Sequence, residues 1–424
     1  MFNFYVLQAL TIYLLSVTAR SDLSAIYMDP RHITNNYSDF IENEPSDYLE
    51  DKQIKSQLIA SSNRLINSLL MKINKSVYEF DKNSDYSIYT GYSGIAFLHY
   101  FNYIKRDNIE SYDIAKYLTD KALTNLKGRD ISFLLGDAGP LALGALIYTK
   151  ENNSEEVENL ISRLLKLPER VSNYPDELLY GRAGYIFALL FLRKHLGNVI
   201  PEDYLKKQLN HLIISGTRTA KTANSMCPLK YLWHGENYLG AAHGIAGILY
   251  ILLLNKDLLT EQILQTLIKP TLDWLISKRY AGGNFPSSDG SRHDKLVQWC
   301  HGAPGFVNLF TLASEIYRSD KYMKVALECG EVVWNRGILM KGYSICHGVS
   351  GNAYTFAHLY QKTNQQLHLH RLACFLNWCN TYPNNEGMRP DRPLSMFEGI
   401  SGVTYFLIDV QDLLTAAFPA YALN

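Results

Sequence analysis

The chain has 424 residues, of which 47% are hydrophobic and 19% are charged. Its 41 basic and 41 acidic residues cancel, and no basic cluster interleaved with aromatic residues stands out. The charge balance argues against nucleic acid or an anionic membrane surface as the main partner, whereas the length and apolar content allow either two or three average domains or one large toroid.

The first segment of the chain is apolar. Residues 2–18 are shorter than the roughly 20 residues of a membrane span, although Val17-Thr18-Ala19 resembles a signal-peptide cleavage site. A secretory signal normally has a Lys or Arg before its apolar run, and none precedes this one. Residues 1–26 are therefore either an extension or a signal-like segment. Residues 29–56 are polar and predict an extended lead-in, and an amphipathic run over 54–77 begins a helical body.

The rest of the chain repeats one pattern. A Gly-x-x-Gly pair followed by an apolar run occurs seven times, with first glycines 45, 45, 63, 58, 46 and 51 residues apart. One such pair carries almost no information, but seven before similar apolar runs indicate a repeated unit. The pairs are Gly91/Gly94, Gly136/Gly139, Gly181/Gly184, Gly244/Gly247, Gly302/Gly305, Gly348/Gly351 and Gly399/Gly402.

Each interval has room for two helices of ordinary length. The glycine-led segments are apolar nearly all round and should be buried, while mixed segments such as 113–126, 155–167 and 321–334 should face solvent on one side. We therefore predict an all-α fold, an α/α toroid of seven inner and seven outer helices. The two longest intervals predict loops over its mouth at 217–240 and 280–294.

Two Cys-His-Gly-x-x-Gly units stand out, at 300–305 and 346–351. Sulfur and imidazole nitrogen are the donors that zinc prefers, which suggests one Zn²⁺ held by Cys300, Cys346 and His347 with a fourth position open for a substrate thiol. The alternative is a closed structural site with His301 as the fourth ligand. Six cysteines are too few for a disulfide framework, and Cys374 and Cys379 follow an apolar helical rhythm and should be buried.

The sequence resembles the lanthionine synthetase C-like family, and in particular its eukaryotic LanC-like branch. The segments that carry the resemblance are Gly-Arg-Ala-Gly at 181–184, Ala-His-Gly-Ile-Ala-Gly at 242–247, Trp-Cys-His-Gly-Ala-Pro-Gly at 299–305, Cys-His-Gly-Val-Ser-Gly-Asn-Ala-Tyr at 346–354 and Arg-Pro-Asp-Arg-Pro-Leu-Ser-Met-Phe-Glu-Gly at 389–399. The resemblance covers roughly residues 27–418, so 27–424 is expected to form a single LanC-like toroid domain.

The resemblance implies a toroid with seven inner helices and one zinc ion at Cys300, Cys346 and His347. Bacterial members cyclise peptides by adding a cysteine thiol to dehydroalanine or dehydrobutyrine. Eukaryotic members bind glutathione and resemble enzymes that add it to such residues in proteins. Glutathione and dehydroamino-acid-containing proteins are then the expected partners. The family implies a cytoplasmic location, with secretion as the alternative if residues 1–19 act as a signal peptide.

The implied reaction needs a thiolate and a proton donor. A coordinating zinc ion deprotonates a thiol that otherwise titrates near pH 8.5. His243 matches the family's acid position and suits protonation of the enolate at carbon, although a structural role at the rim of the toroid is the alternative. Asp176 or Glu177 is expected to orient a proton donor, and His301 is a second candidate proton carrier.

Glutathione carries two carboxylates and one amine, so its contacts should be charged. Lys341 matches a glutathione contact in the family, and Arg389, Asp391 and Arg392 lie in a segment that contacts the same ligand. Lys295 is a further candidate. Met388 departs from the pattern, because a basic residue is expected there. Each of these charges is otherwise an ordinary solvated side chain.

Three functions follow from these features. The first is a zinc-dependent glutathione transferase that forms thioethers on dehydroamino-acid residues. The second is a non-catalytic adaptor that binds glutathione and zinc and recruits signalling partners. The third, a peptide cyclase of the bacterial kind, is disfavoured because no leader-binding extension is visible. The fold alone does not decide, since α/α toroids also host glycosidases and terpene cyclases, but no convincing set of paired carboxylates is present.

Overall fold

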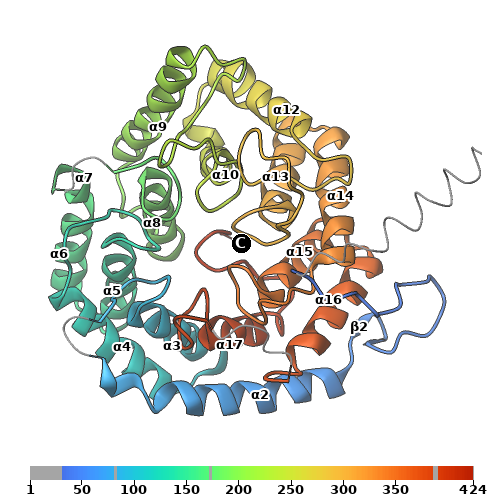
Figure 1. The fold of residues 1–424 in the computed structure, drawn as a ribbon. Helices are drawn as coiled ribbons and strands as arrows, with labels where there is room; N and C mark the ends of the chain where they lie inside the picture. Colours follow the sequence, from blue (N-terminus) through green and yellow to red (C-terminus); the bar gives the residue numbers. More distant parts are fainter. Residues whose placement is uncertain (1–30, 81–83, 171–173, 385–389, 424) are drawn as a thin grey trace, which may run out of the picture.

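A computed structural model describes residues 31–423 of the chain, apart from 81–83, 171–173 and 385–389. The helices form two concentric rings, one inside the other (Figure 1). The segment 1–26, for which a signal-like role was considered, lies outside the described residues.

The inner ring consists of seven of the described helices, and each begins at or just after a glycine pair. Neighbouring inner helices contact one another in chain order, and the last contacts the first, so the ring is closed. Their residues are buried nearly all round, as their apolar sequences predicted. The inner helices are α3 (Tyr92–Arg106), α5 (Ala138–Lys150), α8 (Arg182–Leu196), α10 (Ile245–Leu254), α13 (Val307–Tyr317, preceded by the short η4, Ala303–Phe306), α15 (Val349–Thr363) and α17 (Ile400–Asp409).

The outer ring covers the inner one. Six outer helices each follow an inner helix in the chain, whereas α2 precedes the first inner helix and packs on the last one, α17. The outer helices are α2 (Ser56–Asn74), α4 (Ile109–Thr124), α6 (Ser154–Leu165), α9 (Glu202–Thr222), α12 (Lys269–Ser277, continuing α11, Glu261–Ile263, and η3, Leu264–Ile268), α14 (Asp320–Arg336) and α16 (Gln366–Cys379). Short α7 (Leu167–Arg170), η1 (Val77–Glu79) and η2 (Lys256–Leu258) lie in connections.

The predicted toroid of seven inner and seven outer helices is thus confirmed within the described part of the chain. One boundary was wrong: residues 217–222, expected to belong to a loop, are the last residues of α9. Helix α9 is amphipathic to its end, with Gly216 and Ala220 buried, so its packing continues the helix into the predicted insertion. Strand structure in the described residues is limited to the hairpin of β1 (Leu49–Glu50) and β2 (Gln53–Ile54) and a few isolated bridges.

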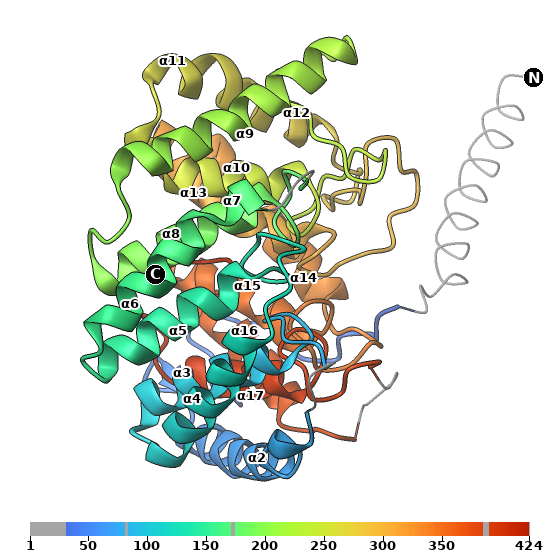
Figure 2. The same ribbon diagram turned by 90° about the vertical axis from the view of Figure 1, so that its left-hand side faces the viewer.

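The two ends of the ring differ. The loops that contain the first glycines gather at one end, which we call the glycine rim. The C-terminal tail, residues 410–423, enters the ring from the opposite end, and its last residues lie at the centre of the view in Figure 1 and across from the long loops in Figure 2. Phe418 stacks on Trp299 with ring centroids 4.6 Å apart, and the Tyr421 hydroxyl donates a hydrogen bond of 3.2 Å to the carbonyl of Gly305.

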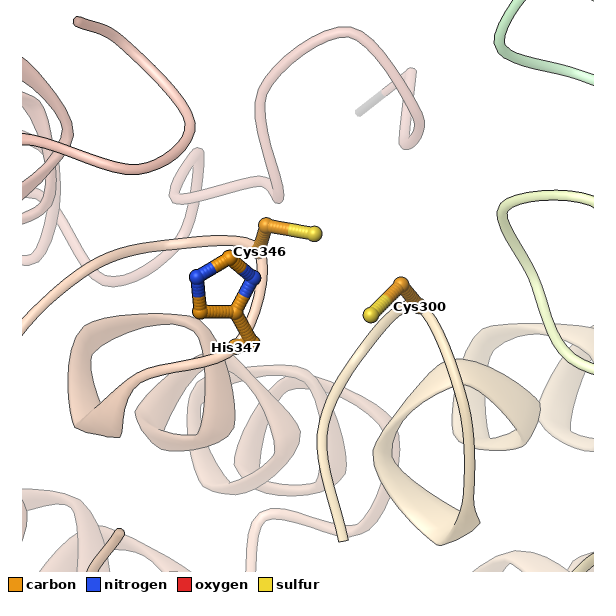
Figure 3. A group of neighbouring side chains, drawn as sticks. All are labelled: Cys300, Cys346 and His347. Carbon is orange, nitrogen blue, oxygen red and sulfur yellow. The ribbon is translucent and has the colours of Figure 1, made fainter. Parts of the chain in front are cut away.

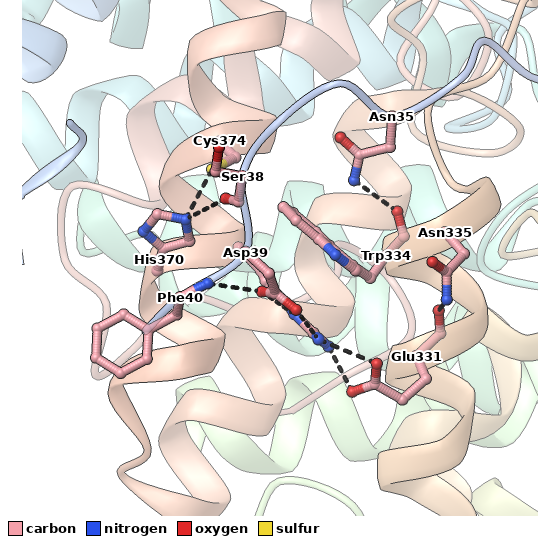
Figure 4. Close-up of polar contacts among 10 residues, drawn as sticks. Asn35, Ser38, Asp39, Phe40, Glu331, Trp334, Asn335, His370 and Cys374 are labelled. Atoms are coloured by element: carbon pink, nitrogen blue, oxygen red, sulfur yellow. Dashed lines mark hydrogen bonds and ion pairs between the residues drawn. The ribbon is translucent and has the colours of Figure 1, made fainter. Parts of the chain in front are cut away.

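Residues 31–48 form an N-terminal strap across the outside of the ring (Figure 4). Its main attachment is Arg371, which is only 3% exposed and donates hydrogen bonds to both Asp39 and Glu331. Asn35 adds a hydrogen bond of 2.8 Å to the carbonyl of Trp334. The predicted extended lead-in is therefore held on α14 and α16 by specific polar contacts.

The remaining cysteines are packing residues. Cys374 and Cys379 are fully buried in α16, as predicted, and burial raises the pKa of Cys379 to about 12.

Within the described residues, helices that combine the length and apolarity needed to cross a bilayer are absent.

Candidate metal centre and active site

The loops of the glycine rim are joined into a circle by their backbones. Six hydrogen bonds of 2.9–3.4 Å link consecutive described loops, and Phe397 in the last loop donates to the carbonyl of Tyr89 in the first. The one remaining step, from the fourth loop to the fifth, is a close packing contact of Gly240 on the carbonyl of Cys300. The six donor and acceptor pairs are Tyr89/Leu134, Leu135/Leu179, Leu178/Ala242, Cys300/Cys346, Cys346/Phe397 and Phe397/Tyr89.

The glycines are needed because each loop folds back onto the start of its own helix. A Cβ atom at Gly184 would lie 2.0 Å from the carbonyl oxygen of Leu178, and one at Gly351 would lie 1.7 Å from that of Ile345. The same fold-back caps the helices, since loop carbonyls accept hydrogen bonds from N–H groups of the first helical turn that would otherwise lack partners. This close approach explains the repeated Gly-x-x-Gly pattern.

The fold-back gives the loops a similar course, although Gly302 has a φ of 106° where Gly91 has −94°, so equivalent positions recur around the circle. The position two residues before the first glycine is occupied by Tyr89, Leu134, Leu179, Ala242, Cys300, Cys346 and Phe397. The next position is occupied by Thr90, Leu135, Tyr180, His243, His301, His347 and Glu398. The predicted metal ligands and the predicted acid are therefore chemical variants of two repeated positions.

The structure brings Cys300, Cys346 and His347 together. Their ligand atoms lie within 4.8 Å of one another, and the two sulfur atoms point toward each other beside the imidazole (Figure 3). A tetrahedral site with bonds of roughly 2.0–2.3 Å has edges of about 3.5 Å, so small side-chain adjustments are sufficient for zinc. His301 is not in this group, because its ring faces Tyr238 and His243 at centroid distances of 5.8 and 6.3 Å. The geometry favours three protein ligands over a closed four-ligand site.

The two thiols differ in acidity. A hydrogen bond from Cys346, opposed by burial, holds the pKa of Cys300 well below its usual value, and His347 lowers it further. Burial raises the pKa of Cys346 well above its usual value, and the neighbouring Cys300 sulfur adds to this effect. A divalent cation in the same place would favour the thiolate form of both.

Two further side chains donate hydrogen bonds to these sulfurs. The hydroxyl of Tyr89 lies 2.9 Å from Sγ of Cys346, and Nε2 of Gln298 lies 3.1 Å from Sγ of Cys300. Tyr89 is fixed by stacking on Phe397 with ring centroids 4.7 Å apart. The sequence analysis missed both residues, although aligning the seven loops on their glycines places Tyr89 at the position of the cysteines.

His243 is held in place by Glu177, one of the two acidic residues that were predicted to orient a proton donor. Oε2 of Glu177 accepts hydrogen bonds from Nδ1 of His243 at 2.8 Å and from the backbone N–H of Leu179 at 2.9 Å. Oε1 accepts from the backbone N–H of Tyr180 at 2.6 Å. Glu177 is 2% exposed, whereas the side chain of His243 is 22% exposed. The buried carboxylate fixes Nδ1–H and directs Nε2 into the rim.

Asp176 has a different role from Glu177. Its carboxylate forms an ion pair with Arg182 and accepts a hydrogen bond from Ser215 on α9. Burial raises the pKa of Asp176, and Arg182 opposes that effect. Arg182 also lies over the ring of Tyr174, 5.1 Å from its centroid. Asp176 therefore ties the third loop to the outer ring, and Glu177 is the residue that orients His243.

Aromatic side chains surround His243. Tyr180 and Trp233 stack on each other at 5.4 Å, and their ring centroids lie 6.1 and 6.2 Å from that of His243. Tyr238 contacts both His243 and His301, and the centroids of these three rings lie 5.8–6.3 Å apart. Trp233 and Tyr238 belong to the loop at 223–244, which pairs with the second insertion through a bridge between Tyr238 and Ser288. Both predicted loops thus meet, and the first forms one wall of the site.

The predicted glutathione contacts are distributed unevenly. Lys341 lines a small cleft with Tyr343, Pro390 and Glu398, next to the loop that carries Cys346. Asp391 and Arg392 are exposed beside Pro390. Lys295 is exposed on the loop before Cys300. Arg389 and Met388 lie outside the described residues.

The fold is a closed double ring of helices, and its glycine rim carries a Cys-Cys-His group and a histidine oriented by a carboxylate. Together these features define the class to which the protein belongs. A family model described as lanthionine synthetase C-like protein matches residues 82–423. The chain is 34% identical over 402 residues to glutathione S-transferase LANCL1 of Danio rerio. The aligned region covers 93% of this chain and 99% of that protein. It is 32% identical over 355 residues to LanC-like protein GCL1 of Arabidopsis thaliana, covering 80% and 81% of the two chains.

Among solved structures, nisin cyclase superposes with a TM-score of 0.64 and 16% sequence identity, over 87% of this chain and 100% of that one. At this identity the likeness concerns the fold. The chain therefore belongs to the lanthionine synthetase C-like family, as its sequence indicated.

Proposed function

We propose that this protein adds the thiol of glutathione to dehydroalanine or dehydrobutyrine residues of proteins, with a zinc ion held by Cys300, Cys346 and His347. The name of the Danio rerio relative supports the choice of glutathione. The observation that carries the proposal is the convergence of a three-ligand group and the Glu177–His243 pair on one rim.

A zinc ion held by Cys300, Cys346 and His347 would bind the substrate thiol as a fourth ligand, lower the pKa of that thiol and so supply a thiolate nucleophile. Tyr89 and Gln298 donate hydrogen bonds to the protein sulfurs and hold them in place. Three protein ligands are the number that catalytic zinc sites use.

The protein's own side chains then act at the two carbon atoms of the dehydro residue's double bond. As the S–C bond forms at Cβ of the dehydro residue, the electrons of the C=C bond move to the amide as an enolate. His243 in its protonated, imidazolium form delivers the Nε2 proton to Cα and is left neutral, while the Glu177 carboxylate accepts from Nδ1–H, stabilises the imidazolium and fixes the orientation of the ring. Tyr180 and Trp233 flank this ring and limit the access of water from that side. We assign the binding of a glutathione carboxylate to Lys341, which is supported by its position in the cleft beside the loop of Cys346.

The test uses purified protein loaded with zinc, glutathione and a peptide with one dehydroalanine, with the thioether product quantified by mass spectrometry. His243→Asn should lower the rate at least 100-fold while leaving the zinc content unchanged, because general acids contribute roughly 10²–10⁴-fold. The matched control is His211→Asn on the exposed face of α9, which should keep the full rate. An unchanged rate in His243→Asn would remove this residue from the mechanism.

The adaptor alternative makes the opposite prediction for the unmutated protein. If the zinc-loaded chain binds glutathione in a calorimeter yet forms no thioether with any dehydro peptide, the binding role stands and the transferase role fails. If neither zinc nor glutathione binds, both proposals fail.

A further inference from the structure

A second cavity lies at the end of the ring opposite the glycine rim. It has a volume of about 700 Å³, within the roughly 300–1,000 Å³ typical of small-molecule sites. Its walls are the C-terminal halves of α3, α5, α8 and α17, and residues 415–423 of the C-terminal tail close one side. The inner helices all start at the glycine rim, so their C-terminal ends place this cavity away from the metal centre.

The interior of the far cavity is aromatic. Phe101 and Tyr405 stack with ring centroids 4.0 Å apart, and Phe97 also stacks on Tyr405, at 5.8 Å. Phe187 and Phe191 continue this surface from α8. Such walls provide a large apolar area with two rotatable side-chain bonds per ring, which suits a hydrocarbon chain.

The mouth of the far cavity is cationic. Lys150 and Lys194 line it, and in the described part of the chain neither forms an ion pair with a carboxylate. Lys105 also lines it and pairs with Asp412 at 3.0 Å. Loss of solvent lowers the pKa of Lys194, which an anion beside the ammonium would reverse.

Two further titratable groups face the cavity. His195 lines the mouth, and burial lowers its pKa. Asp409 is the one carboxylate among the described lining residues, and it is engaged: its Oδ2 accepts from the hydroxyl of Tyr354 and from the backbone N–H of Ala417, both at 2.9 Å. Burial raises the pKa of Asp409 to about 7, so the negative charge that opposes an anionic ligand is only partial at neutral pH and disappears below it.

We propose that the far cavity binds a single-chain amphiphile with a carboxylate head, its hydrocarbon chain against the aromatic rings of α3, α8 and α17 and its head beside Lys194 and Lys150. This site is independent of the metal centre and of the function proposed for it. Each methylene that enters the cavity should strengthen binding about fourfold.

The experiment is calorimetric titration of the full chain with dodecanoate, below its micelle concentration. We expect saturable binding of one molecule per chain, at least tenfold tighter than octanoate and tenfold tighter than dodecanol, which lacks the charge. Lys194→Gln should weaken dodecanoate binding about tenfold, whereas Lys207→Gln, an exposed lysine on α9, should leave it unchanged.

A second variant blocks the mouth without threatening the fold. Ile104 lines the cavity and is 46% exposed, so Ile104→Glu places a repelling charge there and should abolish binding. Ile109, 65% exposed and outside the cavity lining, gives the matched control Ile109→Glu.

Three results would overturn the proposal: no saturable binding, equal binding of dodecyltrimethylammonium, or full binding by Ile104→Glu. Tighter binding of dodecyl phosphate than of dodecanoate would also overturn it, since the carboxylate assignment would be wrong. Thioether formation is measured separately and has no bearing on the outcome.

Discussion

Replacing Glu177 by Gln tests the active-site geometry by exchanging a single carboxylate oxygen for an NH₂ group. Both oxygens of Glu177 accept hydrogen bonds from fixed backbone N–H groups, and one also accepts from His243. A glutamine has a single oxygen, so either orientation turns its NH₂ group toward a backbone N–H donor. One buried donor then loses its acceptor, at a cost of about 1–3 kcal/mol.

The same substitution also acts on the imidazole. If the glutamine oxygen stays with Tyr180, its NH₂ faces Nδ1 of His243, which must then act as an acceptor. A ring with Nδ1 held as an acceptor is not the imidazolium, so the variant disfavours the protonated form that serves as the acid. The same carboxylate-to-amide change behind the histidine of a serine-protease triad lowers the rate by about 10⁴-fold. We expect Glu177→Gln to lose at least 10³-fold in the rate of glutathione addition, about 4 kcal/mol of transition-state stabilisation.

The assay is single-turnover thioether formation with saturating peptide, together with zinc content and the apparent affinity for glutathione. The rate should fall while both of the other quantities stay within a factor of two. The control is Asp176→Asn, a neighbour whose carboxylate binds Arg182 and Ser215 instead, and which should lower stability but keep the rate within threefold. A severe loss of rate in Asp176→Asn with normal turnover in Glu177→Gln would refute the assignment.

Three other changes give distinct readouts. Cys300→Ala should lower zinc retained after dialysis at least tenfold, whereas the equally buried Cys329→Ala should retain it; equal zinc in both variants would contradict the metal site. Burial raises the pKa of Asp409 from 3.8 to about 7, so the stability that its protonated form contributes is fully present below about pH 4 and falls by up to about 4 kcal/mol as the pH rises through 7. In thermal melts Asp409→Asn should lack this decline, and parallel pH curves for the two proteins would show that folding does not raise this pKa. Arg371→Met should speed hydrogen exchange of residues 31–48 about tenfold, since the two partner carboxylates are 41% and 54% exposed and return readily to water; unchanged exchange would mean that other contacts hold the strap.

The repeat explains how much of the fold was predictable from the sequence. The glycine pairs mark the start of every inner helix because each glycine permits a backbone contact that any Cβ atom would prevent, as at Gly351. Helix ends carry no comparable requirement. The end of α9 was therefore misjudged, since an amphipathic surface continues beyond the expected boundary at residue 217.

The site was predictable where chemistry is carried by residue type, as for Cys300 and His347, whose meeting within 4.8 Å of Cys346 follows from the circular arrangement of the loops. The choice between Asp176 and Glu177 was not predictable. Adjacent residues on a loop point in different directions, and only the structure shows which of the two reaches His243. Tyr89 was missed because nothing in its local sequence distinguishes it from a core tyrosine.

The pairing of α2 with α17 has a consequence for biogenesis. While the polypeptide is still being synthesised, residues 56–74 leave the ribosome long before residues 400–409 exist, so the nascent protein is an open arc with an uncovered edge. The loop of Cys346 already accepts from Cys300, but its own N–H receives an acceptor only when Phe397 has emerged, and Phe397 in turn bonds to Tyr89. Fragments that stop short of this last loop should bind metal poorly and expose apolar surface to chaperones, so that only the finished translation product is competent.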